Sequence, residues 1–174
     1  HSVYDMLPIL MIPAEASMFV APVRIPVTGP SISEREPAYA AEAARTAWYG
    51  NAGSFVSRFE NAMAGYVGVP YAIATPHCTA GLHLILAAMG IGPGDEVIVP
   101  DVTWIASVAP VTYVGATPVL VDIRPDTWCI DPEMVEAAIG PRTRAIIGVD
   151  LYGSMCDWPR LETLAEKHGL MLIE

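Results

Sequence analysis

Basic residues are scarce in this chain of 174 residues, and lysine is nearly absent. Eight arginines and a single lysine, Lys167, stand against 19 acidic residues, giving a formal net charge of −10 and a pI near 4.7. Proteins that bind nucleic acid neutralise its phosphates with clustered lysine and arginine. The charge balance therefore excludes nucleic acid as an expected partner, whereas acidity itself indicates little beyond solubility.

Long apolar runs are also missing. No run approaches the roughly 18 residues that a membrane-spanning helix needs, so we expect no membrane partner. Residues 6–12 are apolar, but the segment is short, contains Pro8 and follows no basic stretch, which makes it a poor signal peptide. We interpret residues 1–17 as a leader, a tag remnant or an upstream extension, and residues 18–174 as part of a single folded domain.

Cysteine is limited to Cys78, Cys129 and Cys156, which form no Cys-x-x-Cys motif. Their odd number and the lack of a recognisable secretion signal indicate reduced thiols and a cytoplasmic location. The four histidines are scattered along the chain. The spacing of these residues therefore predicts no metal site.

Apolar residues, by contrast, are unusually abundant in this chain. Hydrophobic residues make up 53% of the sequence, charged residues make up 16%, and the mean hydropathy is +0.41. Strands buried on both faces, as in parallel sheets, would explain this composition. A large surface that awaits a partner would explain it equally well, and we expect both.

Short apolar segments alternate with helical ones along most of the chain. A capping box of Ser33 and Glu36 opens the first helix, and Asp131 and Asp157 are expected to cap two later ones. Such alternation predicts an α/β fold with a mainly parallel sheet and flanking helices. Strands are expected at residues 71–76, 96–100, 118–123, 144–149 and 170–174, and helices at 33–48, 55–66, 79–89, 104–114, 131–139 and 157–168.

Ligand-binding sites in parallel sheets form beyond the carboxyl ends of the strands, so the residues that follow each strand are the candidates for binding or catalysis. Thr79, after the first expected strand, is a good N-cap, and a helix start with small residues suits a phosphate; an ordinary strand-to-helix turn is the alternative. Trp104, after the second, could lie flat on a cofactor ring or pack in a core or interface. Asp150 and Glu174 end later strands, where carboxylates either serve a site or cap and pair locally.

Several motifs in this order resemble the DegT/DnrJ/EryC1/StrS aminotransferases. The resemblance covers residues 23–174 without a break, and its most specific block is Gly-Pro-Gly-Asp-Glu-Val-Ile-Val-Pro ahead of Val-Gly-Ala-x-Pro-Val. It is carried by Gly53-x-x-Val56-x-x-Phe59-Glu60, Thr79-Ala80-x-Leu82-His83-Leu84, AMGIGPGDEVIVPDVTWIASVAPVTYVGATPVLVDI, DTWCIDPEMVEAAIGPRTRAI, LYG and CDWPRLETLAEKHGLMLIE.

The resemblance implies the N-terminal part of the large domain of a fold-type I aminotransferase that uses pyridoxal 5′-phosphate (PLP). Such enzymes place an amino group, usually from glutamate, on a nucleotide-linked keto-sugar, and act as homodimers. Carried over residue by residue, the resemblance implies that Thr79, with the amides of Cys78 and Ala80, holds the PLP phosphate. It further implies that Trp104 stacks on the pyridine ring, that Asp150 lies near the cofactor, and that the loop with Tyr49 and Asn51 lies near the substrate.

The chain departs from the family pattern at three places. Many members have Asn-Gly-Thr where this chain has His77-Cys78-Thr79, and many have His at the position of Asp150. The sequence ends at Glu174, just before the aspartate expected to pair with the pyridine nitrogen and well before the lysine that holds the cofactor covalently. Lys167 follows a helical pattern that places it at the opposite sheet edge, so we expect no catalytic residue here and no activity from these residues alone.

Three hypotheses remain from the sequence. In the first, the chain is a fragment or a truncated frame of a sugar aminotransferase. In the second, it is a non-catalytic phosphate-binding or assembly module that pairs with a full-length subunit. In the third, it belongs to a sugar dehydratase of the same fold, which uses histidine in place of the lysine. The sugar, the nucleotide and the carbon that is aminated cannot be read from these residues.

Overall fold

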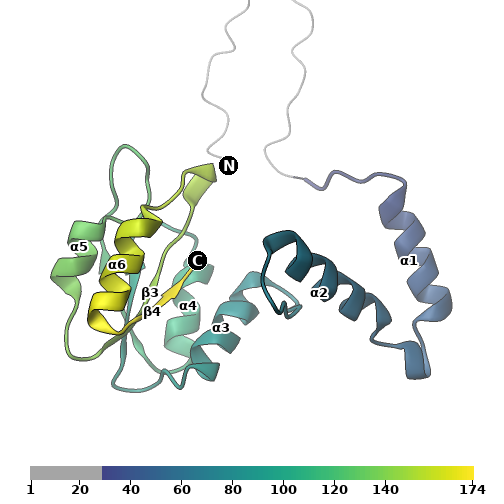
Figure 1. Cartoon of the computed structure of the whole chain (residues 1–174), viewed down its shortest axis with the longest axis horizontal. Coiled ribbons are helices and arrows are strands. Elements are labelled where there is room, and N and C mark those ends of the chain that lie inside the picture. The colour runs from purple at the N-terminus through teal and green to yellow at the C-terminus, as the bar shows by residue number, and fades with distance from the viewer. Residues whose placement is uncertain (1–28) are drawn as a thin grey trace, which may run out of the picture. The chain divides into compact units, whose positions relative to one another are not determined.

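The computed structural model describes residues 29–174, so the interpretation of residues 1–17 lies outside the described part (Figure 1). The chain divides into two compact units, the first ending at Phe55 and the second running over Val56–Glu174. The helices are α1 (Arg35–Thr46), α2 (Ser54–Val67), α3 (Cys78–Ala88), α4 (Ile105–Tyr113), α5 (Pro132–Ala138) and α6 (Trp158–His168). The strands are β1 (Glu96–Pro100), β2 (Thr117–Val121), β3 (Thr143–Ile147) and β4 (Met171–Ile173), and two short 3-10 turns cover Tyr49–Asn51 and Leu151–Gly153.

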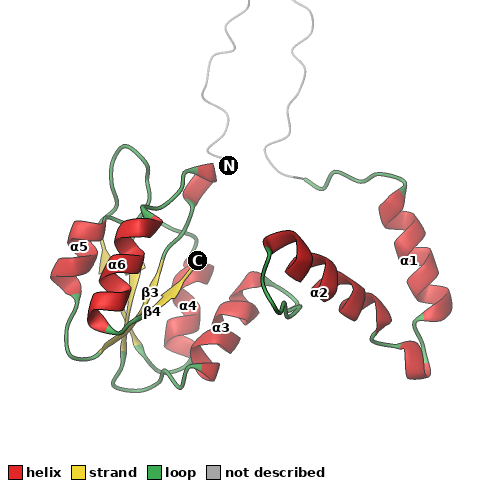
Figure 2. Ribbon diagram, viewed as in Figure 1, coloured by secondary structure: helices red, strands yellow, loops and turns green. Residues whose placement is uncertain are grey.

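The four strands form one parallel sheet in the order β2-β1-β3-β4 (Figure 2). β1 lies at the centre and pairs with β2 from Glu96↔Thr117 to Pro100↔Val121. On its other side, Ile98 pairs with Ile146 of β3. The α/β fold with a parallel sheet and flanking helices is thus confirmed, and β1 has the bounds that its apolar pattern predicts.

Both faces of the sheet are covered by helices. Alternate residues of the central strands point to opposite faces, so that Val97 and Val99 join one core cluster and Ile98 joins the other. Leu82 and Leu86 of α3 and Val111 of α4 complete the first cluster. Helices α5 and α6 supply the second, with Val135, Leu161 and Leu164. Burial on both faces explains why the strands read as continuous apolar runs.

The residues predicted to begin and end helices make the expected local contacts. Ser33 and Glu36 interact ahead of α1, where the Ser33 amide donates to the Glu36 carboxylate at 2.7 Å. The Asp131 carboxylate accepts from the amide of Glu133 at 2.9 Å at the start of α5. Gly169 ends α6 in the left-handed region at φ 66°, which a glycine adopts without strain.

The strand predicted at residues 71–76 does not form. No described strand lies beside this segment, and a strand exists only where a neighbour completes its hydrogen bonds. The amide of Ala74 instead donates to the carboxylate of Glu60 in α2 at 2.9 Å. The side chains of Tyr71 and Ile73 are consequently exposed. The apolar pattern was typical of a strand, but the pairing that would make it one is absent within residues 29–174.

The N-cap of α3 is His77 and not Thr79, which corrects a second prediction. The backbone of His77 is extended, and its Nδ1 accepts a hydrogen bond from the Ala80 amide at 3.1 Å. Thr79 lies one residue inside the helix. Threonine is the more common cap, but the helix begins one residue earlier than the pattern suggested, and this places histidine at the capping position.

A close contact fixes α6 against the end of β3. The six-membered ring of Trp158 covers Gly148, and a Cβ built on that glycine would overlap Cη2 and lie 2.8 Å from Cζ3. Gly148 therefore allows the indole to lie directly on the backbone. Among the buried side-chain nitrogen and oxygen atoms of the described residues, Trp158 Nε1 is the one without a hydrogen-bond partner.

We predict that Gly148→Ala lowers the free energy of unfolding by about 1–3 kcal/mol, the usual cost of forcing extra volume into a packed site. Urea unfolding followed by circular dichroism measures the change. Gly140→Ala is the matched control, because its Cβ would meet only the Glu96 carboxylate, at 4.0 Å. Equal stability of the two variants would show that Trp158 does not pack tightly on this strand.

We predict that His77→Ala lowers the free energy of unfolding by about 1 kcal/mol, the typical value of a lost N-cap. His77→Asn should retain most of that stability, because its side-chain oxygen can accept the Ala80 amide. The same urea titration compares the two variants. The capping role is contradicted if asparagine destabilises the protein as much as alanine does.

Candidate functional site

The carboxyl ends of the strands meet at one edge of the sheet because all pairings are parallel. β1 continues past Pro100 toward Trp104, and the Asp101 amide donates to the Val121 carbonyl at the end of β2 at 3.0 Å. Asp150 follows β3, three residues after its last residue. The topology thus brings Trp104 and Asp150 to the same edge, as the sequence predicts for strand ends.

Helix α3 runs in the opposite direction to the strands, so its first turn points toward this same edge. The position of its C-terminal end is shown by the residues around a hollow of about 190 Å³. Met89 and Gly90, which follow the helix, line this hollow together with Asp95, Arg144 and Met171. The last three residues lie at the amino ends of β1, β3 and β4. Since an α-helix of this length rises about 16 Å, the N-terminus of α3 lies far from that edge.

The first turn of α3 has two backbone amides without partners among the described hydrogen bonds, those of Cys78 and Thr79. The Ala80 amide donates to both the Nδ1 and the carbonyl of His77, and the Gly81 amide donates to the same carbonyl. Unpaired amides and the helix dipole together favour an anion at this position. Of the three residues predicted to hold a phosphate, Cys78 and Thr79 therefore have amides available to it. The Ala80 amide is already engaged by the His77 cap.

Trp104 occupies the N-cap position of α4 with an extended backbone, and its side chain makes no capping hydrogen bond. The indole is 76% exposed, so the core packing considered from sequence is ruled out within the described residues. Behind it, the Thr103 and Ser107 hydroxyls are hydrogen-bonded at 3.1 Å, which holds the start of the helix. The aromatic face at this edge is thus available to a ring or to a partner.

Asp150 is partly buried, and one of its carboxylate oxygens accepts a hydrogen bond from the Cys156 amide at 2.7 Å. The Sγ atoms of Cys129 and Cys156 and a carboxylate oxygen of Asp150 all lie within 4.8 Å of one another. Burial, with Cys129 and Asp150 beside it, raises the pKa of the Cys156 thiol to about 12. Sequence spacing missed this cluster because Cys129 comes from a different connection than Asp150 and Cys156.

The predicted substrate residues belong to the first unit. Tyr49 is 99% exposed and adopts a positive φ of 54° at the start of a 3-10 turn. The Asn51 side-chain amide donates to the Thr46 carbonyl at 2.8 Å, which closes the turn onto the end of α1. Within its own unit, the loop therefore presents a tyrosine to its surroundings and holds the asparagine in place.

The single lysine, Lys167, lies away from Trp104 and Asp150. Lys167 is in the last turn of α6, two residues before Gly169, which lines the hollow at the amino ends of the strands. Its Nζ pairs with the Glu136 carboxylate of α5 at 2.7 Å, and this ion pair lowers the pKa of Glu136. The structure thus places Lys167 at the sheet edge opposite Trp104 and Asp150.

His83 is neither buried nor at the strand-end edge. It is exposed on α3, and its ring meets Tyr113 of α4 edge-on with 5.7 Å between centroids. Within residues 29–174, His83 is therefore outside the core and is free to face a partner surface. No helix of this described range has the length and apolar character required to cross a bilayer.

Comparison with known proteins places this arrangement in a family. Residues 30–174 match the profile of the DegT/DnrJ/EryC1/StrS aminotransferase family. GDP-perosamine synthase of Caulobacter vibrioides is 50% identical over 151 residues, which are 87% of this chain and 41% of the relative. L-glutamine:2-deoxy-scyllo-inosose aminotransferase of Streptomyces fradiae is 49% identical over 72% of this chain and 30% of its own length. The chain thus spans 41% and 30% of the lengths of these two relatives.

Solved structures agree with the fold. The aminotransferase from Psychrobacter cryohalolentis matches with a TM-score of 0.78 and 36% identity over 82% of this chain and 36% of that protein. A candidate sugar aminotransferase from Streptococcus pneumoniae, in its PLP form, matches with a TM-score of 0.77 and 40% identity over the same shares. The chain therefore belongs to the DegT/DnrJ/EryC1/StrS family of PLP-dependent sugar aminotransferases.

Proposed function

We propose that these residues supply the phosphate-binding and ring-stacking part of the PLP site in an enzyme that aminates a nucleotide-linked keto-sugar, with glutamate as amino donor. The observation that carries the proposal is the first turn of α3, where two unpaired amides lie toward the edge that also carries Trp104 and Asp150. Family membership supports the cofactor, and the geometry supports the way in which this chain would hold it.

The phosphate would be bound by the first turn of α3. The amides of Cys78 and Thr79 are unpaired, and the Thr79 hydroxyl lies one residue inside the same turn. Hydrogen bonds to a charged acceptor are stronger than those between neutral groups, so three donors at one helix start suit a dianion. The neutral cap of His77 leaves these donors free because it engages only Ala80.

The pyridine ring would lie against Trp104. An exposed indole at a strand end offers a flat apolar face, and offset stacking of aromatic rings stabilises a complex by about 0.5–1.5 kcal/mol beyond simple burial. When bound, PLP supplies an electron sink for the carbanion formed at the amino-bearing carbon. Asp150 would act indirectly at this edge, since the Cys156 amide holds its carboxylate in place.

The relatives favour a nucleotide-linked sugar as substrate. The GDP-perosamine synthases of Caulobacter vibrioides and Escherichia coli O157:H7 align with 87% and 86% of this chain, against 72% for the inosose aminotransferase of Streptomyces fradiae. In the first unit, Tyr49 and Asn51 form an exposed turn, and the family resemblance implies that this loop lies near the substrate. We therefore assign the keto-sugar to that turn.

We further propose a cytoplasmic homodimer. Large apolar side chains are exposed on several elements of the second unit, and a patch of this kind requires a covering surface in solution. The most exposed are Tyr152, Tyr66, Tyr71 and Trp104, followed by Ile73 and Ile105. Burial of these side chains by a second subunit, or by further residues of the enzyme, would account for the apolar composition noted from the sequence.

We predict that Thr79→Val weakens PLP binding by the purified chain by about tenfold or more, since a hydrogen bond to a charged group contributes about 1.5–3 kcal/mol. Equilibrium dialysis measures the affinity. Thr163→Val is the matched control, because that hydroxyl donates to the Pro159 carbonyl in α6 and lies outside the proposed site. The loss should disappear for pyridoxal without its phosphate; an equal loss for both ligands contradicts a phosphate contact.

We predict that a polypeptide of these 174 residues does not transfer an amino group from glutamate to a GDP-linked keto-sugar. Its single ε-amine is paired with Glu136 at the opposite edge, so no lysine can hold the cofactor or move the proton. Chromatographic detection of the amino-sugar tests this. Turnover that is lost in Lys167→Arg would overturn the prediction, whereas chromatographic detection of dehydrated sugar would favour the dehydratase hypothesis.

A further inference from the structure

Two connections of the second unit, β2–α5 and β3–α6, bring two cysteines and a carboxylate together at the edge that carries the proposed cofactor site. Cys129 lies between β2 and α5, Asp150 follows β3, and Cys156 precedes α6. Their ligand atoms all lie within 4.8 Å of one another. We propose that Cys129, Asp150 and Cys156 form a binding site for a thiophilic divalent cation, with Zn²⁺ as the ion that this ligand set suits best.

The two sulfurs are removed from solvent. Cys129 is 2% exposed and Cys156 is 5% exposed. As thiols they have only weak acceptors, the nearest being the Ser154 carbonyl at 3.6 Å from Cys129 and the Val149 carbonyl at 3.4 Å from Cys156. Packing alone accounts for small buried side chains in this core cluster, but it does not account for a carboxylate within reach of both sulfurs.

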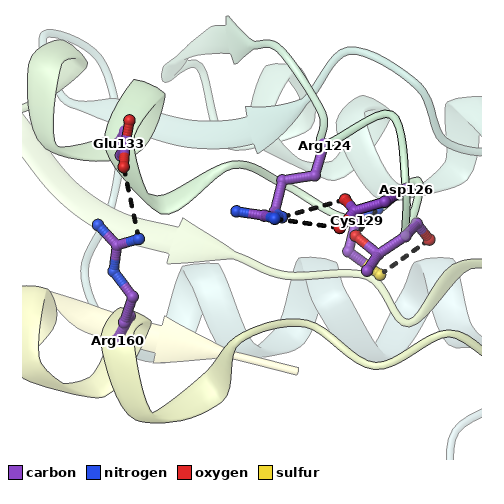
Figure 3. Close-up of polar contacts among 6 residues, drawn as sticks. Arg124, Asp126, Cys129, Glu133 and Arg160 are labelled. Carbon is purple, nitrogen blue, oxygen red and sulfur yellow. Dashed lines mark hydrogen bonds and ion pairs between the residues drawn. The ribbon is translucent and has the colours of Figure 1, made fainter.

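The cluster lacks a compensating positive charge. Arg124 lies five residues before Cys129 in the sequence, and it forms two hydrogen bonds with Asp126 (Figure 3). Arg160 faces Glu133 at 3.7 Å in the same view. These basic groups are therefore occupied by other carboxylates. A bound dication would supply the charge that the described side chains around Asp150 do not.

The chemistry of the donors selects the ion. Thiolates and carboxylates both bind zinc, with Zn–S bonds of about 2.3 Å, and three protein ligands leave a fourth position for water. A tetrahedral ion holds two such sulfurs about 3.8 Å apart, so the atoms need to approach by no more than about 1 Å. Binding displaces the two thiol protons to solvent, which makes the affinity rise with pH.

Oxidation to a disulfide is the competing use of two neighbouring thiols. That reaction needs a thiolate, and burial of Cys156 beside the Asp150 carboxylate raises the pKa of its thiol and so disfavours one there. A dication acts in the opposite sense, because its charge stabilises the deprotonated sulfurs it binds. Spacing in the sequence predicted no metal site, since the two cysteines lie in different connections and form no short motif.

The test uses the purified, reduced chain with Cd²⁺ alone, without PLP, so that its outcome is independent of the proposed function. We expect an ultraviolet thiolate-to-cadmium charge-transfer band that saturates at one ion per chain and is removed by competing Zn²⁺. Cys129→Ser and Cys156→Ser should abolish the band. Cys78→Ser is the matched control, because that thiol is exposed on α3 and outside the cluster, and it should leave the band unchanged.

A second measurement protects the test against variants that fold poorly. Zn²⁺ should raise the melting temperature of the unaltered chain and of Cys78→Ser. Asp150→Asn should lower the Zn²⁺ affinity at least about tenfold, as the loss of a group supporting a metal site usually does. The proposal is overturned if the band persists in the serine variants, if Cys78→Ser removes it, or if mass spectrometry shows that the two cysteines are already joined as a disulfide.

Discussion

The arrangement of the second unit depends on the parallel pairing of β1 with strands on both sides. Val97, Ile98 and Val99 are fully buried, and their alternate side chains supply both core clusters. A slip of one residue in this register would exchange the two faces and break both clusters at once. Because each connection between parallel strands must cross a face, the same pairing also determines where the helices lie and which edge receives the strand ends.

The carboxyl edge of the sheet carries backbone amides, an aromatic side chain and a carboxylate because of the direction in which the chain runs. Helix α3 returns antiparallel to the strands, so its amide-rich first turn lies toward the carboxyl ends that lead to Trp104 and Asp150. The opposite edge collects the charged turns, where Asp95 receives the Gly92 amide and pairs with Arg144 at 3.0 Å. The fold thereby separates a side suited to ligands from a side held by local ion pairs, and this division is a property of the topology.

Local signals predicted most of the fold and only part of the site. The bounds of β1 and the caps at Asp131 and Asp157 depend on neighbours in the sequence, and they were predicted correctly. The segment at residues 71–76 could not be predicted, because a strand requires a partner that its own residues do not reveal. The grouping of Cys129 with Cys156 is likewise tertiary, since only the closeness of two loops after separate strands creates it.

The one ε-amine in the chain also determines how the molecule could be handled. Lys167 is exposed at the end of α6, and apart from the α-amine it is the only site for an amine-reactive dye, bead or cross-linker. A chain attached there would present the edge of Trp104 and Asp150 outward, away from the support. Within these 174 residues, Lys167 is thus the single side chain available for attachment by amine chemistry, with the edge of Trp104 and Asp150 left open.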